Sequence, residues 1–394
     1  MKTYIAPPMP VAPAAVIARL EQNGFTAHAV GGCVRDTLLG LSPTDWDITT
    51  NALPEQTKAV FADCRVIETG IQHGTVTVLF EGVPFEITTY RVDGDYHDNR
   101  HPDAVSFTTS LFEDVKRRDF TVNAMVWHPH DGICDFFDGK ADLEHTLLRT
   151  VGNPTQRFSE DALRILRLLR FSATYGLQAE TQTKYAACQL AAHLRNIAVE
   201  RIRVELEKLL CGDYVTTVIS DFTEIWKVIL PEIDVQSKKA LQQLPKDVPL
   251  RWAYLLQNAP VKAVLKRLKA DNATIHTVEA IINGLTLTPT TEPIALKQIL
   301  RVYGEEILLQ IVDLQKVCGD TALWEATETA LIDLLATNPC YRLKDLQING
   351  NDLRALGFSG KAIGDTLETL LDAVICERCE NTSGALLALT KTLL

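Results

Sequence analysis

The 394-residue chain lacks an uninterrupted apolar run of the roughly 18 residues that a membrane-spanning helix needs. Four prolines between residues 7 and 13 interrupt the apolar stretch at the start of the chain, so a signal-peptide core is excluded as well. The nine cysteines are an odd number, and they are scattered without the close spacing of a small disulfide scaffold. We therefore expect a soluble cytoplasmic protein with free thiols.

The chain also has fewer basic than acidic residues. The chain has 39 Lys and Arg residues against 50 Asp and Glu residues, a net charge of −11, which argues against a uniformly basic protein that coats nucleic acid. A confined basic groove stays compatible with this balance, because a binding partner responds to the local field. Residues 151–210 contain nine basic and six acidic residues, so this segment is a candidate for an anion site.

The length and the hydrophobic pattern predict an α+β protein of more than one domain. A chain of 394 residues is expected to form two or three domains of about 150 residues. Up to about residue 150, β-type runs alternate with short helical stretches, and residues 75–80 and 84–90 flank a Gly-containing turn, which predicts a hairpin. From about residue 158 the apolar spacing is helical, with one continuous helix expected over residues 158–174.

Two carboxylates stand two residues apart where a strand is expected to begin, in the sequence Asp45-Trp46-Asp47. Side chains two apart on a strand project from one face, so these carboxylates are expected to converge. A convergent pair suits Mg²⁺, which prefers oxygen ligands and completes its shell with water and phosphate. Taken alone, such a pair is more often part of a solvated turn.

Just upstream, residues 31–36 (Gly-Gly-Cys-Val-Arg-Asp) join an expected strand end to a helix start. Glycines let the backbone approach a polyphosphate closely, and the first N–H groups of a helix can bind it. The guanidinium of Arg35 would add two parallel donors. By itself, this element is better explained as an ordinary tight strand-to-helix turn.

Two further segments extend the pattern: Arg-Arg-Asp-Phe-Thr-Val-Asn-Ala-Met over residues 117–125 and Arg-Phe-Ser-Glu-Asp-Ala-Leu-Arg over residues 157–164. With residues 29–36 and the Asp-Trp-Asp at 45–47, they resemble the class II tRNA nucleotidyltransferases (CCA-adding enzymes) and the bacterial poly(A) polymerases of the DNA polymerase β-like superfamily. The resemblance covers roughly residues 20–210. It is to the short bacterial form, which has no phosphohydrolase domain.

This resemblance implies a polymerase β-like catalytic head at the N-terminus, followed by an all-helical neck, body and tail. In that arrangement the neck carries the nucleotide-selecting helix and the tail binds tRNA. The expected boundaries are 1–150 for the head, 151–215 for the neck, 216–335 for the body and 336–394 for the tail.

The resemblance also implies the reaction. Asp45 and Asp47 would hold two Mg²⁺ ions while the 3′-hydroxyl of an RNA attacks the α-phosphorus of a nucleoside triphosphate and expels pyrophosphate. A third carboxylate is expected on a neighbouring strand. Glu86 is the candidate, with an ordinary exposed strand glutamate as an equal alternative.

Asp161 and Arg164 are expected to lie three residues apart on one helix face and to select the nucleotide. Their acceptor and donor match the amino group and ring nitrogen that cytosine and adenine share, and they mismatch uracil and guanine. Arg118 and Asn123, around an expected helix start, would contact the ribose and phosphates. The other residues assigned to nucleotide binding are Gly32, Arg35, Arg167 and Arg170; for the last two, a salt-bridged solvent face is the alternative.

Three features favour CCA addition. Residues 68–78 lack the basic Gly-Arg-Arg-Phe motif usual in poly(A) polymerases, the loop at 90–103 that CC-only enzymes lack is present, and residues 348–364 are similar to the tail of short CCA-adding enzymes. We expect CTP, ATP and the tRNA 3′ end as partners, Mg²⁺ as cofactor and no membrane, and we leave a homodimer open. The alternatives are an A-adding enzyme, a bacterial poly(A) polymerase and a non-catalytic RNA-binding relative.

Overall fold

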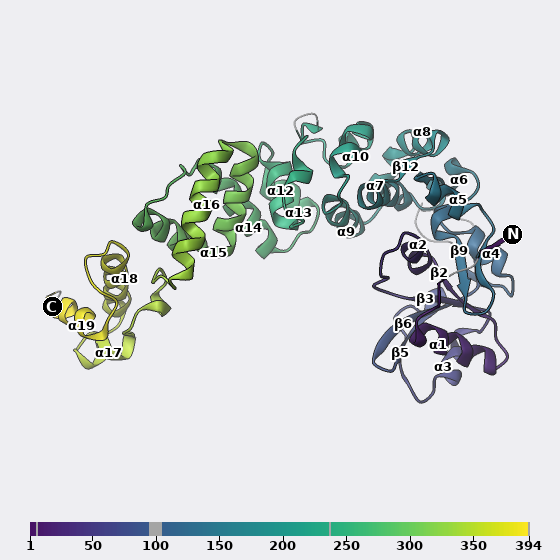
Figure 1. The fold of residues 1–394 in the computed structure, drawn as a ribbon, viewed down its shortest axis with the longest axis horizontal. Coiled ribbons are helices and arrows are strands. Elements are labelled where there is room, and N and C mark those ends of the chain that lie inside the picture. Colours follow the sequence, from purple (N-terminus) through teal and green to yellow (C-terminus); the bar gives the residue numbers. More distant parts are fainter. Residues whose placement is uncertain (5–6, 94–104, 236–237, 393–394) are drawn as a thin grey trace. The chain divides into compact units, whose positions relative to one another are not determined.

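The computed structural model describes residues 1–4, 7–93, 105–235 and 238–392. They form two compact units, Met1–Ser237 and Lys238–Leu394 (Figure 1). The first unit combines a β-sheet with helices and the second is helical, which confirms the predicted α+β class. Among the described residues, no helix is both long and apolar enough to span a bilayer.

The first unit is built around an eight-stranded sheet with the strand order β1-β10-β9-β2-β3-β6-β5-β4. β3 and β6 run parallel, and the other neighbours run antiparallel. The strands are β1 (Lys2–Tyr4), β2 (Ala27–Val30), β3 (Asp47–Thr50), β4 (Arg65–Ile67), β5 (Thr75–Phe80), β6 (Val83–Thr89), β9 (Met125–His128) and β10 (Gly132–Asp135). Two short ladders pair β7 (Arg91–Asp93) with β8 (Val105–Phe107) and β11 (Leu147–Leu148) with β12 (Gln178–Ala179).

Two tight turns of the sheet depend on glycine. The predicted hairpin is confirmed, because β5 and β6 pair across a two-residue turn. Both turn residues have a positive φ, 51° at Glu81 and 82° at Gly82, as a type I′ turn requires. Gly31, which leads from β2 into α2 (Gly32–Leu38), has φ 81° and ψ −124°, a conformation that residues with a side chain rarely adopt.

The first helices of the unit pack on the sheet, and later ones pack mainly on other helices. α1 (Val11–Gln22) and α2 pack on β2, and α3 (Pro54–Val60) packs on β5 and β6. The remaining helices of the first unit are α4 (Leu111–Lys116), α5 (Gly139–Glu144), α6 (Pro154–Glu160), α7 (Leu163–Tyr175), α8 (Thr181–Gln189), α9 (Val199–Leu210), α10 (Val215–Asp221) and α11 (Thr223–Ile229). α10 and α11 pack on α7 and α8 in this unit, although the predicted body begins at residue 216; the four-part division stays a prediction.

The continuous helix predicted over residues 158–174 is wrong. The chain leaves the helical conformation at Asp161, which has φ −137° and ψ 104°, and α7 starts anew two residues later. The Asp161 carboxylate accepts a hydrogen bond from the backbone N–H of Leu163 at 3.0 Å, so it takes up one of the unpaired donors at the new helix start. Apolar periodicity passes across this break because Phe158 of α6 and Leu163 and Leu166 of α7 are all buried.

The second unit contains α12 (Val248–Leu256), α13 (Val261–Arg267), α14 (Asn272–Asn283), α15 (Pro293–Cys318), α16 (Thr321–Ala336), α17 (Gly350–Ala355), α18 (Lys361–Ile375) and α19 (Ser383–Lys391). α15 and α16 share a core around Leu300 and Trp324, and α17 to α19 surround a second core around Leu353 and Leu370. α15 is kinked at Gly304, where φ is 74° and ψ is 171°.

α15 also contacts the second core's helices. Lys297 forms an ion pair with Glu377 at 2.9 Å, and Arg301 forms ion pairs with Glu368 and Asp372 of α18. All of these contacts lie on the N-terminal side of the kink at Gly304. The part of α15 before the kink therefore contacts both cores, while residues on both sides of the kink pack in the first core with α16.

Candidate active site

The predicted carboxylates lie at one edge of β3. Asp47 is the first residue of β3 and Asp45 lies just before it, and the parallel register pairs Asp47 with Glu86 of β6. Burial raises the pKa of Asp47 to about 6, although Arg118 lowers it, and the charges of Glu86 and Asp45 raise it further. The position predicted for a third carboxylate is therefore beside Asp47, while the role of Glu86 stays a prediction.

A hollow of about 600 Å³ opens next to these carboxylates. It is lined from four directions: the β2–α2 turn, the start of β3, the segment after α4, and one face of α7 with the end of α9. The predicted site residues that line it are Gly32, Arg35, Asp45, Asp47, Arg118, Asn123, Arg167 and Arg170. Residues far apart in the sequence are thus brought to one cavity, as the resemblance implies.

Arg35 is held rigidly at the floor of this hollow. It donates to Asp36 at 2.8 Å, to the Asn123 side-chain oxygen at 2.7 Å and to the Tyr175 hydroxyl at 2.6 Å. Its guanidinium also lies 4.3 Å from the centre of the Tyr175 ring and 5.0 Å from that of Phe171. Sequence reasoning missed these two aromatic residues, since their helical spacing reads as ordinary core packing.

Arg118 lies close to Asp47, and one of its N–H donors is not used by any described residue. The Cβ that any other residue would place at Gly31 would come within 3.0 Å of its Nη1, which is a second reason for glycine there. The ion pair that Arg118 forms with Asp114 is long, at 4.0 Å, and the buried Nε of Arg118 has no hydrogen-bond partner among the described residues. A buried donor without a partner is costly, so the position favours an anionic ligand.

The expectation of a helix start around residues 118–123 is wrong. These residues form a turn between α4 and β9 that contains only the short 3₁₀ helix η2 (Thr121–Asn123). The Asp119 carboxylate accepts from the N–H of Phe120 at 2.8 Å and from the Asn123 amide at 3.1 Å, so side-chain bonds replace helix formation. This turn directs Arg118 and Asn123 into the hollow.

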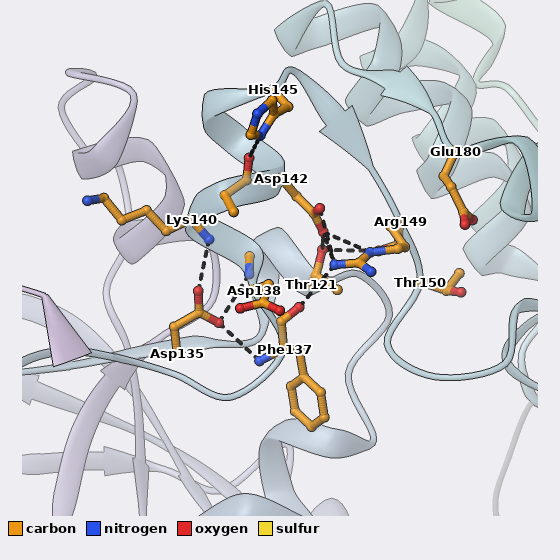
Figure 2. Close-up of polar contacts among 12 residues, drawn as sticks. Thr121, Asp135, Phe137, Asp138, Lys140, Asp142, His145, Arg149, Thr150 and Glu180 are labelled. Carbon is orange, nitrogen blue, oxygen red and sulfur yellow. Dashed lines mark hydrogen bonds and ion pairs between the residues drawn. The ribbon is translucent and has the colours of Figure 1, made fainter. Parts of the chain in front are cut away.

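A polar network behind this turn fixes its position (Figure 2). Asp142 of α5 accepts a hydrogen bond from the Thr121 hydroxyl and pairs with Arg149 at 3.1 Å. The Asp135 carboxylate accepts three backbone N–H groups at the start of α5, those of Phe137, Gly139 and Lys140. Gly139 lies against the Thr121 carbonyl, which would be 2.2 Å from a Cβ at this position. The segment that carries Arg118 is therefore anchored from outside the hollow.

The arginines of α7 are paired with buried carboxylates. Arg167 donates to Asp119 at 2.7 Å, and Arg170 pairs with Glu205 of α9 at 3.1 Å. Burial favours the neutral form of Asp119, but Arg167 and the Asn123 amide outweigh it and hold the pKa of Asp119 below its usual range. Both arginines line the hollow and both are salt-bridged, so their role in nucleotide binding stays a prediction.

Asp161 and Arg164 do not share a helix face, because the helix break separates them. Asp161 lies in the break and accepts from Arg201 at 3.3 Å. Arg164, in the first turn of α7, donates to Glu160 at 2.8 Å and to the carbonyls of Arg157 and Arg117. Neither lines the hollow, since each is engaged by protein partners beside it. Their nucleotide-selecting role stays a prediction.

The donor set fits a hard divalent cation. Among the described residues, no group of three or more His, Cys, Asp or Glu side chains has metal-binding geometry. Mg²⁺ usually takes only one or two protein carboxylates and fills its other positions with water and substrate phosphates, which Asp45 and Asp47 can match. The loop at 90–103 that CC-only enzymes lack lies mostly outside the described residues, which omit 94–104.

Three family models match the chain. Residues 27–149 match the poly A polymerase head domain, residues 176–236 match a probable RNA and SrmB-binding site of polymerase A, and residues 246–390 match a putative tRNA nucleotidyltransferase domain 2. The CCA-adding enzyme of Lactiplantibacillus plantarum is 36% identical over 390 residues, covering 94% of this chain and 93% of its own. That of Limosilactobacillus fermentum is 37% identical over 373 residues, covering 91% of each chain.

A solved structure is similar over nearly the full length. The crystal structure of the Bacillus stearothermophilus CCA-adding enzyme in complex with CTP matches with a TM-score of 0.81 and 30% identity, covering 97% of both chains. The Thermotoga maritima CCA-adding enzyme complexed with tRNA shares the fold, with a TM-score of 0.64 and 20% identity.

Proposed function

The chain belongs to the CCA-adding tRNA nucleotidyltransferases, and we infer from this that it adds C, C and A to the 3′ end of tRNA, using CTP and ATP and releasing pyrophosphate. One observation of the site carries this proposal. Asp47 lies in register with Glu86 and next to Arg118, in a hollow that Arg35 and the α7 arginines also line. Carboxylates for a cation stand beside guanidinium groups for a polyphosphate, as nucleotidyl transfer requires.

Asp45 and Asp47 are the proposed ligands of Mg²⁺. When bound, the metal supplies activation of the attacking 3′-hydroxyl and neutralisation of charge on the leaving pyrophosphate. The chain's own residues hold the carboxylates in place, since the β3–β6 register fixes Asp47 and burial limits access of water to it.

The triphosphate is proposed to lie along Arg35 and Arg118, over the Gly31–Gly32 turn. Arg35 is fixed by three polar partners and two aromatic rings, so little conformational freedom is lost when an anion binds it. Arg118 has an unused Nε and lies beside Asp47, at the metal end of the hollow. This places the two guanidinium groups to bind the phosphates and leaves the α7 side of the hollow for the sugar and base.

Base selection is assigned to Asp161 and Arg164. In the structure Asp161 bonds to Arg201 and Arg164 to Glu160, so reading a base requires that both exchange these partners for the nucleotide. The helix break makes such an exchange local, because the Oδ2 of Asp161 can leave Arg201 while its Oδ1 keeps the bond from the Leu163 N–H.

The helical segments are proposed to bind tRNA. The matches of residues 176–236 and 246–390 to RNA-binding and tRNA nucleotidyltransferase models support this. In the second unit, residues 261–270 hold four basic and no acidic residues, and Lys262 and Lys266 of α13 are exposed. Lysines on one helix face can follow an RNA backbone without reading its sequence.

The test is single-nucleotide incorporation. Transcripts of tRNA that end before CCA, after C or after CC are incubated with Mg²⁺ and with labelled CTP, ATP, UTP or GTP, then with CTP and ATP together. We expect C, C and A in order, with addition then stopping. A-only addition after CC would indicate an A-adding enzyme, long A tails a poly(A) polymerase, and tRNA binding without incorporation a non-catalytic relative.

The Asp47→Asn variant is the control for the active site. It keeps the size of the side chain and removes the charge, so incorporation is expected to fall at least about 10²- to 10³-fold while tRNA binding is unchanged. Asp333→Asn, an exposed change on α16, should leave incorporation unaffected. Full activity of Asp47→Asn would contradict the assignment of the metal site.

A further inference from the structure

A second hollow of about 470 Å³ lies on the other side of α7. We name it the neck hollow; it is formed by the C-terminal end of α7 with β12, α8 and α10. Its polar and aromatic lining residues are Ser172, Gln178, Lys184, Tyr214, Asp221 and Phe222. The volume is within the range of about 300–1,000 Å³ that small-ligand sites occupy.

α7 separates the neck hollow from the active-site hollow. Phe171 and Thr174 line the active site, whereas Ser172 and Gly176 line the neck hollow. Residues four apart lie on one face of a helix, and neighbouring residues point about 100° apart, so the two hollows use different faces of α7. No residue of the proposed catalytic or nucleotide-binding set lines the neck hollow.

A buried hydroxyl in this hollow has no partner. Ser172 is only 5% exposed, and its Oγ makes no hydrogen bond to any residue that the structure describes. A serine within a helix can usually bond back to a carbonyl of the preceding turn, and Ser172 does not. Burying a polar group without a partner is unfavourable, so a ligand that bonds this hydroxyl would be favoured. The Oγ itself is buried, so a ligand in the hollow meets it after a rotation about χ1 of Ser172.

Tyr214 supplies an aromatic platform. Its ring lies against Gly176, where an added Cβ would come within 2.8 Å of it, and yet the residue is 50% exposed. Its backbone N–H donates to the Ala173 carbonyl at 2.8 Å, which fixes the platform to the end of α7. A half-exposed tyrosine held in this way offers a flat surface to a planar group.

The rim of the neck hollow carries one charge of each sign. Lys184 and Asp221 face each other at 3.6 Å, both partly exposed, and the Lys184 Nζ lies 5.2 Å from the centre of the Phe222 ring. An exposed pair at this separation is weak, so either partner can turn to a ligand. An ammonium group suits a phosphate, and a carboxylate suits an amino group on a ring.

We propose that the neck hollow binds one unstacked nucleobase of the RNA substrate, with the base on Tyr214, its polar edge at Ser172 and its phosphate near Lys184. Single-stranded RNA is typically held by aromatic stacking, hydrogen bonds to base edges and a nearby cation, and this hollow combines all three. It falls in the segment assigned above to RNA binding, so the inference rests on the proposed function.

The experiment compares tRNA affinity and CTP affinity in matched variants. Tyr214→Ala should weaken binding of a transcript ending in CC by about 5- to 100-fold, the effect typical of one lost base stack, and Tyr214→Phe should restore it. Ser172→Ala should weaken it by a few fold. CTP affinity, measured without RNA, should stay unchanged because none of these residues lines the active-site hollow. Tyr185→Ala is the control, since this tyrosine is 68% exposed on α8 but does not line the neck hollow.

A second variant, which fills the neck hollow with a larger side chain, keeps the inference testable if Tyr214→Ala does not fold. Thr217 is exposed and lines the hollow, so Thr217→Trp occupies the space without removing a native contact, and it should also weaken tRNA binding. Wild-type tRNA affinity in Tyr214→Ala and Thr217→Trp would overturn the inference. So would a loss of CTP affinity equal to the loss of tRNA affinity, which would indicate a displaced α7. If the wild-type protein binds tRNA but adds no nucleotide, the proposed function fails while the binding comparison still decides the neck hollow.

Discussion

Asp161 lies between α6 and α7, where the backbone leaves the helical conformation. The two oxygens of its carboxylate accept hydrogen bonds from different partners. One oxygen accepts the Leu163 N–H and the other accepts from Arg201. The first bond shapes the chain and the second can be released. The proposed reading of a base by Asp161 would therefore tie nucleotide selection to the start of α7.

This leads to a prediction on specificity. Asp161→Ala removes the acceptor for the amino group that cytosine and adenine share, so discrimination between CTP and UTP should fall by about 10- to 100-fold. The ratio of kcat/KM for the two nucleotides on a CC-less transcript measures this. Arg201→Ala removes only the resting partner of Asp161, and should therefore keep the preference for CTP. An unchanged ratio in Asp161→Ala would contradict base reading by this residue.

His28 gives a prediction on acid stability. Burial, and to a lesser degree His128 beside it, lower the pKa of His28 to about 4, while Asp131 opposes the shift; its Nδ1 is 3.2 Å from the Tyr90 hydroxyl. The unfolded chain binds the proton near pH 6.5, so stability is complete above that pH and falls as the pH drops from 6.5 toward 4. The loss should reach at most about 3 kcal/mol.

The measurement is the urea midpoint at pH 7.5 and pH 5. His28→Gln should reduce the difference between the two midpoints, because a glutamine takes up no proton. His276→Gln alters an imidazole whose side chain is 76% exposed, and should leave the difference as in the wild type. An equal effect of both substitutions would exclude His28 as the source.

At the scale of elements, the β5–β6 hairpin and the turn from β2 into α2 follow from the sequence because residue alternation and turn glycines are local signals. The α6–α7 break does not, because buried apolar residues continue on both sides of it, and the side-chain bond of Asp161 to the Leu163 N–H leaves no apolar signal. The turn at 118–123 was missed for a similar reason, since Asp119 and Asn123 bond the backbone in place of a helix. The motifs predicted eight of the residues lining the active-site hollow, but not Tyr175 and Phe171, whose contact with Arg35 depends on tertiary packing.

The kink in α15 gives a prediction on stability. Gly304 has φ 74° and ψ 171°, a region that is essentially limited to glycine, and no atom lies within 4 Å of a Cβ placed there. Gly304→Ala should therefore destabilise the protein by about 1–3 kcal/mol through backbone strain alone. Gly364→Ala is the matched change, because Gly364 lies within α18, also with open space around it, and alanine should stabilise that helix by up to about 1 kcal/mol.

Chemical denaturation of the two variants checks the opposite signs. A gain in stability from both substitutions would mean that α15 runs straight through residue 304 in solution.

For the whole molecule, the contrast is between a net charge of −11 and the basic face of α13. Binding to an RNA backbone releases counterions in proportion to the phosphates contacted, so local lysines set the salt dependence even in an acidic protein. Lys262→Ala with Lys266→Ala should weaken tRNA binding several-fold near 0.1 M salt and lower the slope of log K against log salt by about 1–2.

Affinity measured at several salt concentrations checks this. The control is Lys58→Ala. Lys58 lies on α3 and pairs with Glu55 and Glu68, so its removal should change neither the affinity nor the slope. A slope that stays constant in the double variant would exclude α13 from the RNA interface.

The position of α7 between two hollows has a thermodynamic consequence. If one ligand lies against each face of the helix, any free energy by which the first alters the second must act equally in the reverse direction. RNA held at Tyr214 that tightened CTP binding tenfold would be tightened tenfold by CTP in return. The two substrates would then act as effectors of each other, and a ternary complex would form more readily than either binary affinity predicts.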